Sequence, residues 1–466
     1  MTRRITINPA TRLGRQAKIE ILLDNQGEVE DIFWQTGGFP CFERVCLGRP
    51  VEEMPRITPN ICGFCATSHN IASSKALDDI YSVEPTATAK LIRQLQHNAS
   101  LVEDYFLHFF LLSAPDLVLG PEVNPAKRNI LGELRRFGPE VVAKVFEVRQ
   151  RCRQITAHIG SKSSHPEGGL PGGVSRGITE EERKWIRDTA DFTVESAQQA
   201  MEIFKKFVLE NPTYLKLVQN KDSQLRTFYM GLVDDRNRVS FYEGKLRVVD
   251  PNGKEYALFN YREYMNHIGE HVDPQTHVRL NYLKQAGWKG LVEDEGASLY
   301  RVGPLARLNV ADEMATPLAE RECEMMFDTL GGKPSHHTMA YHWAGLIEAL
   351  QAAEQMRRLA NDPLLTSKDV RNTNLKLKNI GIGCVEAVRG TLIHHYETDN
   401  QGLVTKAKLI TATQNNAAAI SLSARKAVIA GIKNGDISEE MLNQVEMVFR
   451  AYNPCLGCNN HDLFGL

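Results

Sequence analysis

Two Cys-x-x-Cys pairs constrain the fold of this chain more than any other feature of its sequence. The first pair is Cys62 and Cys65 and the second is Cys455 and Cys458, so almost the whole 466-residue chain lies between them. Two residues between cysteines bring both thiolates to the same side of a turn, where they can bind one metal centre. If both pairs bind the same centre, the two ends of a large protein must meet in its interior.

The ligand type narrows the chemistry of such a centre. Four thiolates form a soft donor set that suits zinc, iron–sulfur or nickel and iron, and that disfavours magnesium and calcium. A structural zinc site is the most common explanation for two such pairs, but structural zinc sites usually join cysteines of one short segment. The long separation instead favours a reactive centre that is shielded deep inside the fold.

The composition is that of a soluble globular protein, with 42% apolar residues, 24% charged residues and a net charge of −2. This charge gives no electrostatic reason to expect nucleic acid or an anionic membrane as a partner. The N-terminal segment lacks the apolar stretch of a signal peptide, and the most apolar segment, 105–115, is about half as long as a membrane span. We therefore expect a cytoplasmic protein without direct membrane insertion, whose nine cysteines include metal or redox sites rather than disulfides.

The hydrophobic periodicity predicts an α+β protein that is predominantly α-helical, a large helical bundle with small antiparallel β additions. Pro115 is expected to end the first long helix, and turn sequences between alternating residues predict two β-hairpins. No linker or repeat interrupts the pattern, so we expect a single domain over residues 1–466. The predicted helices cover 86–113, 139–159, 179–209, 338–359, 417–434 and 438–452, the hairpins cover 17–34 and 239–259, and a further strand covers 404–413.

Nucleotide-binding motifs are missing from the sequence. Gly332-Lys333 lacks the preceding glycine of a phosphate loop, and the glycine-rich segment 168–173 lacks the spacing of a dinucleotide-binding turn. The chain should therefore bind no nucleotide itself, and any electrons that it handles must pass to another protein.

The two cysteine blocks resemble those of a known family. Ile61-Cys-Gly-Phe-Cys-Ala-Thr-Ser-His69 and Pro454-Cys-Leu-Gly-Cys-Asn-Asn-His461 are similar to the paired blocks of the large, catalytic subunit of [NiFe]-hydrogenases. Within that family the chain resembles the soluble, bidirectional, multi-subunit branch. Weaker likenesses cover the middle of the chain, at 39–50, 111–116, 165–173 and 384–390.

The resemblance implies an enzyme that reversibly cleaves H2 into protons and electrons at a nickel–iron centre. In the family the electrons pass to iron–sulfur clusters of a partner small subunit, then on to an acceptor module. By resemblance this module is NAD(P)-linked or electron-bifurcating, with further flavin and iron–sulfur subunits, and heterodisulfide-linked or deazaflavin-linked modules come next. Two alternatives are the hydrogenase-like quinone-reductase subunit of respiratory complex I, which lacks the cysteine ligands, and a non-catalytic protein with a structural zinc.

The resemblance also implies a role for each paired cysteine. Cys62 and Cys455 match terminal nickel ligands, whereas Cys65 and Cys458 match ligands that bridge nickel and iron. The iron of such centres carries carbon monoxide and cyanide ligands. Cys455 is the first candidate for the base that takes a proton from H2, with Cys62 as the alternative, and His69 is placed to hydrogen-bond a bridging sulfur.

Further matches lie outside the cysteine pairs. Arg389 matches an arginine over the open face of the metals, and Thr413 is a candidate donor to an iron-bound cyanide. Glu43 and His461 match residues that bind a magnesium or similar ion near the C-terminus, with the backbone carbonyl of Leu409 as a third ligand.

Other histidines and cysteines have weaker assignments. His165 matches a position that faces the nearest iron–sulfur cluster of the partner subunit. The remaining cysteines show no ligand spacing and are expected to be buried apolar side chains. They are Cys41, Cys46, Cys152, Cys323 and Cys384.

The chain departs from the family pattern at several positions. Gly14 stands where the family has a proton-relaying glutamate, so a water chain, another acid such as Glu386, or a different route must carry the proton. Asn453 replaces the aspartate before Pro-Cys, and Val388 replaces a proline beside the family arginine.

The chain also continues past the last histidine of the second block. In the family a protease removes the residues after this histidine once nickel is loaded. Asp462–Leu466 is therefore a candidate maturation tail, which is either removed or kept in the working enzyme.

Overall fold

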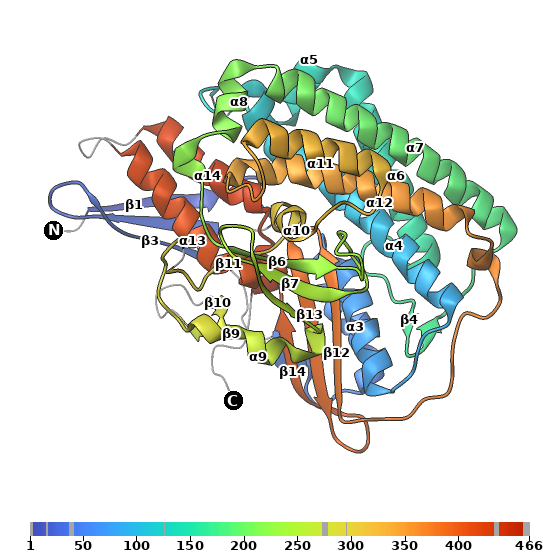
Figure 1. Ribbon diagram of the computed structural model, residues 1–466. Helices are drawn as coiled ribbons and strands as arrows, with labels where there is room; N and C mark the ends of the chain where they lie inside the picture. The colour runs from blue at the N-terminus through green and yellow to red at the C-terminus, as the bar shows by residue number, and fades with distance from the viewer. Residues whose placement is uncertain are drawn as a thin grey trace.

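Four long helices pack together as a bundle in the computed structural model, which describes residues 3–14, 17–36, 42–124, 126–272, 278–294, 296–432 and 438–459 (Figure 1). They are α4 (Ala87–Phe106), α6 (Pro139–Gly160), α7 (Glu180–Phe204) and α12 (Tyr341–Asn361). α12 packs against α4 and α7, and α4 also packs against α6. Because α12 is buried on nearly all sides, it is the central helix of the bundle.

Side-chain caps fix where two of these helices begin. The Thr179 side chain accepts a hydrogen bond from Glu182 N, and the Glu182 carboxylate accepts one from Thr179 N, a capping box that starts α7. The Thr86 hydroxyl caps α4 in the same manner by accepting from Ala89 N. The other helices are α1 (Phe42–Cys46), α2 (Met54–Ile57), α3 (Ala66–Ile80), α5 (Ile130–Phe137), α8 (Pro212–Val218), α9 (Tyr264–His267), α10 (Pro304–Val310), α11 (Pro317–Leu330), α13 (Ala412–Gly431) and α14 (Glu439–Tyr452).

The strands form small sheets around the bundle. β1, β2 and β3 make an antiparallel sheet, the four-stranded sheet has the order β11-β6-β7-β8 with β11 parallel to β6, and β9 pairs with β10 and β4 with β5. Another three-stranded sheet has the order β12-β13-β14 and is antiparallel throughout. The strands are β1 (Arg3–Ala10), β2 (Ala17–Leu23), β3 (Val29–Thr36), β4 (Gly169–Leu170), β5 (Gly173–Val174), β6 (Phe228–Val233), β7 (Lys245–Val249), β8 (Glu255–Phe259), β9 (Ile268–Val272), β10 (Arg279–Leu283), β11 (Tyr300–Arg301), β12 (Ile380–Ala387), β13 (Gly390–Thr398) and β14 (Val404–Ile410).

Helix α3 lies directly on the β12-β13-β14 sheet, and two glycines of β12 make this close approach feasible (Figure 1). A Cβ atom on Gly383 would lie 2.1 Å from the carbonyl oxygen of Ala72, and one on Gly381 would lie 2.3 Å from that of Ala76. No side chain fits at these positions, so the helix backbone rests on the strand backbone.

The predicted fold class is confirmed, and most predicted elements are present. Helices lie close to the predicted ranges 86–113, 139–159, 179–209, 338–359 and 438–452, one hairpin lies close to 17–34, and the other lies within 239–259. In the second hairpin the first strand begins only at Lys245. Within the described residues no helix has the length and apolar character that crossing a membrane requires.

The expectation that Pro115 ends its helix is wrong. α4 continues in π-helical turns over Leu107–Ser113 and Pro115–Leu119, and most of this segment is buried. Pro115 is the first residue of the second π-helical segment, a position where the N–H that proline lacks is not required, so the helical path continues past it.

The predicted strand over 404–413 is too long. β14 ends at Ile410, and the Thr411 hydroxyl accepts a hydrogen bond from Gln414 N, which starts α13 at Ala412. The helix predicted from residue 417 therefore begins earlier, and Thr413 belongs to its first turn.

Candidate metal centre

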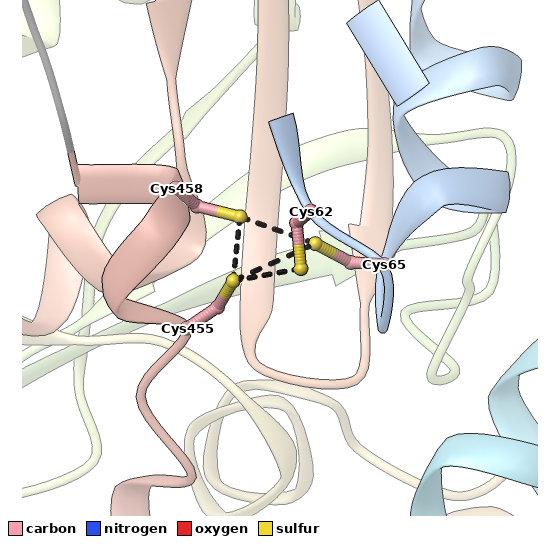
Figure 2. A group of neighbouring side chains, drawn as sticks. All are labelled: Cys62, Cys65, Cys455 and Cys458. Carbon is pink, nitrogen blue, oxygen red and sulfur yellow. Dashed lines mark hydrogen bonds between the residues drawn. The ribbon is translucent and has the colours of Figure 1, made fainter. Parts of the chain in front are cut away.

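The four paired cysteines meet in the interior of the protein, as their spacing predicts (Figure 2). Their sulfur atoms all lie within 4.8 Å of one another, and all four residues are buried. Cys455 Sγ lies 2.9 Å from Cys62 Sγ and 2.8 Å from Cys458 Sγ, and Cys65 Sγ lies 3.2 Å from Cys458 Sγ. Two segments from opposite ends of the chain thus present their sulfurs to one point.

Local backbone structure aims each sulfur. Cys62 ends a short 3-10 helix over Thr58–Ile61, and Cys65 is the residue directly before α3. On the other side, Asn453 adopts a left-handed conformation (φ 50°, ψ 49°) that ends α14 and turns the chain toward Cys455. Cys458 lies in the 3-10 helix Leu456–Asn459, so each pair spans one tight turn.

The N-termini of two helices point toward the sulfurs. α3 begins immediately after Cys65, and α13 begins immediately after Thr411, whose hydroxyl donates to the carbonyl of Cys458 at 3.0 Å. The Thr413 hydroxyl accepts from Cys455 N at 2.9 Å. Helix N-termini carry partial positive charge, so this position stabilises thiolates and other anions.

The thiols by themselves cannot all ionise in so small a space. Hydrogen bonds from the thiol of Cys455, and from those of Cys458 and Cys65, hold the pKa of Cys62 well below its ordinary value. The hydrogen bond to Cys455 raises the pKa of Cys65, and burial raises that of Cys458. Four thiolates therefore require cations between them, and an all-sulfur donor set of this kind fits nickel and iron.

Arg389 lies beside the cysteines in the turn between β12 and β13, and it is almost fully buried. Its guanidinium forms an ion pair with Asp104 of α4, with Nη2 donating to Asp104 Oδ1 at 3.1 Å, and Nη2 also donates to Asn453 Oδ1 at 3.0 Å. The guanidinium carbon lies 5.6 Å from the centre of the Phe64 ring. A permanent cation is therefore fixed next to the sulfurs.

Asp104 is a functional-site residue that the sequence did not reveal. It lies in the middle of α4, where nothing in the pattern separates it from the neighbouring Glu103. Burial raises the pKa of Asp104 to about 6, and the charge of Arg389 opposes this rise. Only the packing of α4 against the β12-β13 turn shows which of the two acids binds the arginine.

His69, the residue predicted to hydrogen-bond a bridging sulfur, lies next to Cys458. His69 Nε2 lies 3.6 Å from Cys458 Sγ, and His69 lines a small cavity beside the cysteines. The cavity is lined by Cys65, His69, Ala387, Arg389, Leu392, Thr411, Ala412, Thr413, Cys455 and Cys458. Arg389 and Thr413 thus face the same space as three of the cysteines.

The proposed magnesium ligands are only partly described. Glu43 and Leu409 lie together as expected, but through the backbone N–H of Leu409, which donates to Glu43 Oε1 at 2.8 Å. His461 lies outside the described residues, as does the tail 462–466.

Gly14 lies beside Phe64 and Pro454, which belong to the two cysteine segments. A Cβ atom there would lie 3.4 Å from the Phe64 ring and 3.4 Å from the carbonyl oxygen of Pro454. Glu386, the suggested replacement acid, instead forms an ion pair with Arg307 at 2.5 Å and accepts from Thr391 at 2.8 Å, and it does not line the cysteine cavity.

The other predicted residues that the structure describes do not line the cysteine cavity. His165 follows α6 in a partly exposed loop. Four of the unpaired cysteines are buried as predicted, namely Cys46, Cys152, Cys323 and Cys384, and Cys41 lies outside the described residues.

Comparison with known proteins places this site in a family. A family model described as nickel-dependent hydrogenase matches residues 41–128, and a HoxL-like model matches residues 4–39. The chain is 44% identical to an F420-non-reducing hydrogenase iron–sulfur subunit of Archaeoglobus profundus, over 99% of this chain and 95% of that protein. It is 31% identical to NAD-reducing hydrogenase HoxS subunit beta of Cupriavidus necator, over 99% of this chain and 96% of that protein.

A solved structure agrees with these relatives. A crystal structure of an NAD+-reducing [NiFe]-hydrogenase in the H2-reduced state matches with a TM-score of 0.91 and 32% identity, over 99% of this chain and 100% of that chain. These relatives match over nearly the whole of this chain, and the four cysteines cluster in its interior. The chain is therefore neither a structural zinc protein nor the complex I-like subunit. The chain therefore belongs to the nickel-dependent hydrogenases and is the catalytic large subunit of a [NiFe]-hydrogenase, an enzyme that acts on H2.

Proposed function

We propose that Cys62 and Cys455 are terminal nickel ligands and that Cys65 and Cys458 bridge nickel and an iron with carbon monoxide and cyanide ligands. The observation that carries this proposal is the group of four buried sulfurs within 4.8 Å, beside a buried arginine. Held by these cysteines, a nickel–iron centre would supply the Lewis acidity that makes H2 acidic enough for a nearby base to take its proton.

The proton from H2 passes to Cys455 Sγ in this proposal, with Cys62 Sγ as the second candidate. Cys455 is held through its backbone N–H by Thr413, and its sulfur lies within the electrostatic reach of Arg389. A guanidinium stays charged at neutral pH, so it can stabilise the negative charge of the reacting site without giving up a proton.

Two donors are available for cyanide ligands. Arg389 Nε is buried and has no hydrogen-bond partner within the described residues. The Thr413 hydroxyl accepts from Cys455 N, which leaves its own proton free to be donated. Both residues line the cysteine cavity, where an iron-bound cyanide could accept from them.

The magnesium site near the C-terminus is proposed to use Glu43, His461 and the backbone carbonyl of Leu409. The contact between Glu43 and the Leu409 backbone supports the pairing of these two residues. One carboxylate, one imidazole and a carbonyl leave coordination positions that water would fill.

Electrons are proposed to leave through a small iron–sulfur subunit, with His165 facing its nearest cluster. From there they reach a NAD(P)-linked or electron-bifurcating module of further flavin and iron–sulfur subunits in a cytoplasmic complex. The names of the relatives support this choice, since one is NAD-reducing and another is F420-non-reducing, which disfavours a deazaflavin acceptor. The whole chain, 1–466, acts as one domain in this proposal.

Metal analysis and infrared spectroscopy of the purified complex test the centre. We expect nickel and iron in equal amounts, with infrared bands of iron-bound carbon monoxide and cyanide. Cys458→Ser should lose both metals, whereas Cys323→Ser, which alters a buried cysteine on α11, should keep them. Zinc as the sole metal would contradict the proposal.

Arg389→Lys tests the proposed role of the guanidinium. A lysine lacks the rigid planar fork with which Arg389 binds Asp104 and Asn453, so the positive charge would be less firmly fixed beside the sulfurs. We expect H2 oxidation to fall by about 10²-fold at unchanged nickel content. The control is Arg149→Lys, which changes an arginine paired with the neighbouring Glu103 and should leave the rate unaltered.

A further inference from the structure

A continuous chain of buried hydrogen bonds leads away from the cysteine cluster. Cys458 Sγ lies 3.6 Å from His69 Nε2, and His69 Nδ1 lies 2.9 Å from His394 Nε2. His394 Nδ1 lies 2.7 Å from the Tyr396 hydroxyl, which lies 3.1 Å from the Ser73 hydroxyl. The sulfur is thus connected to a serine on the far side of two imidazoles and a phenol.

Regular secondary structure places these groups in a row. His69 and Ser73 are four residues apart on α3 and lie on one face of that helix. His394 and Tyr396 are two residues apart on β13, so they point to one face of the sheet. The row forms where this helix face meets this strand face.

The glycines of β12 provide the space for the rings. Gly383 is the register partner of His394, and Gly381 is the partner of Tyr396. Opposite residues of an antiparallel pair point to the same side, so β12 presents no side chain where β13 presents these two. Helix α3 can then approach the sheet closely enough for His69 and Ser73 to reach the rings.

The sulfur determines which group donates and which accepts in every hydrogen bond of this row. A metal-bound thiolate accepts hydrogen bonds, so His69 must carry its proton on Nε2. A neutral imidazole has one N–H, so His69 Nδ1 accepts, and His394 must donate from Nε2. His394 Nδ1 then accepts from the Tyr396 hydroxyl, which in turn accepts from Ser73.

Burial favours this neutral arrangement over a charged one. All four groups have at most 1% of their surface exposed. Burial holds the pKa of His394 well below its ordinary value and that of Tyr396 well above it. His394 therefore stays neutral and Tyr396 stays a donor.

We propose that His394 and Tyr396 are positioning residues that fix the tautomer of His69 and aim its Nε2–H at Cys458 Sγ. They touch neither substrate nor metal and act only through His69. A donor fixed on this sulfur withdraws electron density from it, and through it from the metals that it binds. This inference rests on the proposed nickel–iron centre.

The strand offers a matched control for the test. Tyr264 Oη lies 2.9 Å from His395 Nδ1, so a second buried tyrosine contacts a second buried histidine of β13. His395 follows His394 in the strand and therefore points to the opposite face of the sheet. Neither Tyr264 nor His395 lines the cysteine cavity.

Infrared spectra of the purified complex carry the first test. Tyr396→Phe removes the donor to His394, and we expect the band of iron-bound carbon monoxide to move to lower frequency as Cys458 becomes more electron-rich. Tyr264→Phe should leave the band in place. An unmoved band in Tyr396→Phe, or an equal shift in both variants, would overturn the positioning role.

A pair of His394 variants provides a second test that also applies if Tyr396→Phe retains no nickel. Gln can donate an N–H toward His69 as His394 does, whereas Leu cannot. His394→Gln should keep the wild-type band position, and His394→Leu should show the shift. Identical spectra for the two would contradict the inference. Absence of carbon monoxide and cyanide bands from the wild-type complex would instead overturn the proposed centre, and this inference with it.

Discussion

The net charge beside the cysteines depends on the ion pair between Arg389 and Asp104. Asn453 stands where the family has a second acid, so a carboxylate and an amide together hold the guanidinium. Burial raises the pKa of Asp104 to about 6 against the opposing charge of Arg389. The carboxylate is therefore ionised at neutral pH and takes up a proton as the pH falls through about 6, where the ion pair is lost.

Asp104→Asn is expected to remove this pH dependence. In the parent enzyme H2 oxidation should decline below about pH 6, because neutral Asp104 no longer holds Arg389. The amide side chain of the variant is neutral at every pH. Its rate of H2 oxidation should therefore be lower by about 10²-fold, and it should show no further decline at acidic pH. The measurement is the rate of H2 oxidation against pH at known nickel content.

The neighbouring acid is the control for this prediction. Glu103 of α4 binds Arg149 and Arg153 instead of Arg389. Glu103→Gln should therefore keep the decline of the rate at acidic pH. If this decline persists in Asp104→Asn, a group other than Asp104 causes it.

Gly14→Glu tests whether protons avoid the position of the family glutamate. A Cβ atom at Gly14 fits in ordinary contact with Phe64 and Pro454, but a carboxylate would be placed against the Phe64 ring. We expect turnover to slow by roughly tenfold, the effect of ~1.4 kcal/mol, with metal content intact. Gly14→Ala should leave turnover unchanged, and a large acceleration in Gly14→Glu would show that protons can use this route.

At the scale of elements, the contact of α3 with β12 holds the two halves of the site in place. α3 carries His69 and follows Cys65, while β12 leads into the turn that carries Arg389. Their close approach depends on Gly381 and Gly383. The sequence predicted neither α3 nor β12, because the buried face of α3 carries serine, asparagine and histidine side chains that do not produce a hydrophobic period.

Gly383→Ala should destabilise this contact. The new methyl group would lie 2.1 Å from the backbone oxygen of Ala72, which can yield only if the helix moves. We expect the free energy of unfolding to fall by about 1–3 kcal/mol or more, together with loss of nickel. Chemical denaturation and metal analysis would check this.

Gly296→Ala is the matched control for this substitution. A Cβ atom there meets no atom of the described residues within 4 Å. It should therefore alter neither stability nor nickel content. Equal stability of the two variants would show that α3 does not depend on the close approach.

At the scale of the whole molecule, the metal centre joins the first fifth of the chain to its last residues. The last two cysteine ligands lie shortly before the segment Asp462–Leu466. Because two of the four clustered sulfurs come from the Cys455–Cys458 turn, the group of four is complete only when this turn packs against the Cys62–Cys65 turn.

The mass of the intact subunit tests whether the tail is then removed. We expect the nickel-loaded subunit to lack Asp462–Leu466, and Cys458→Ser, which cannot complete the ligand set, to retain it. Mass spectrometry of both purified proteins would show the difference. A full-length mass in the nickel-loaded subunit would mean that the tail belongs to the working enzyme.

The meeting of the four cysteines and the helical architecture can be predicted from the sequence alone. A Cys-x-x-Cys pair is a local feature, because one turn sets the distance between its sulfurs, and the amphipathic helices show their period within a single segment. Local patterns failed where a cap or a wider helical turn moved a boundary, as at Thr411 and Pro115.

The surroundings of the ligands, in contrast, depend on tertiary packing. Asp104 meets Arg389 across 285 residues, and His69 meets His394 across 325. Such pairs depend on how helices and strands pack, and the chain carries no local signal for them. The physical reason is that a turn has few conformations and can be read from neighbouring residues, whereas a long-range contact exists only once the whole core has selected it.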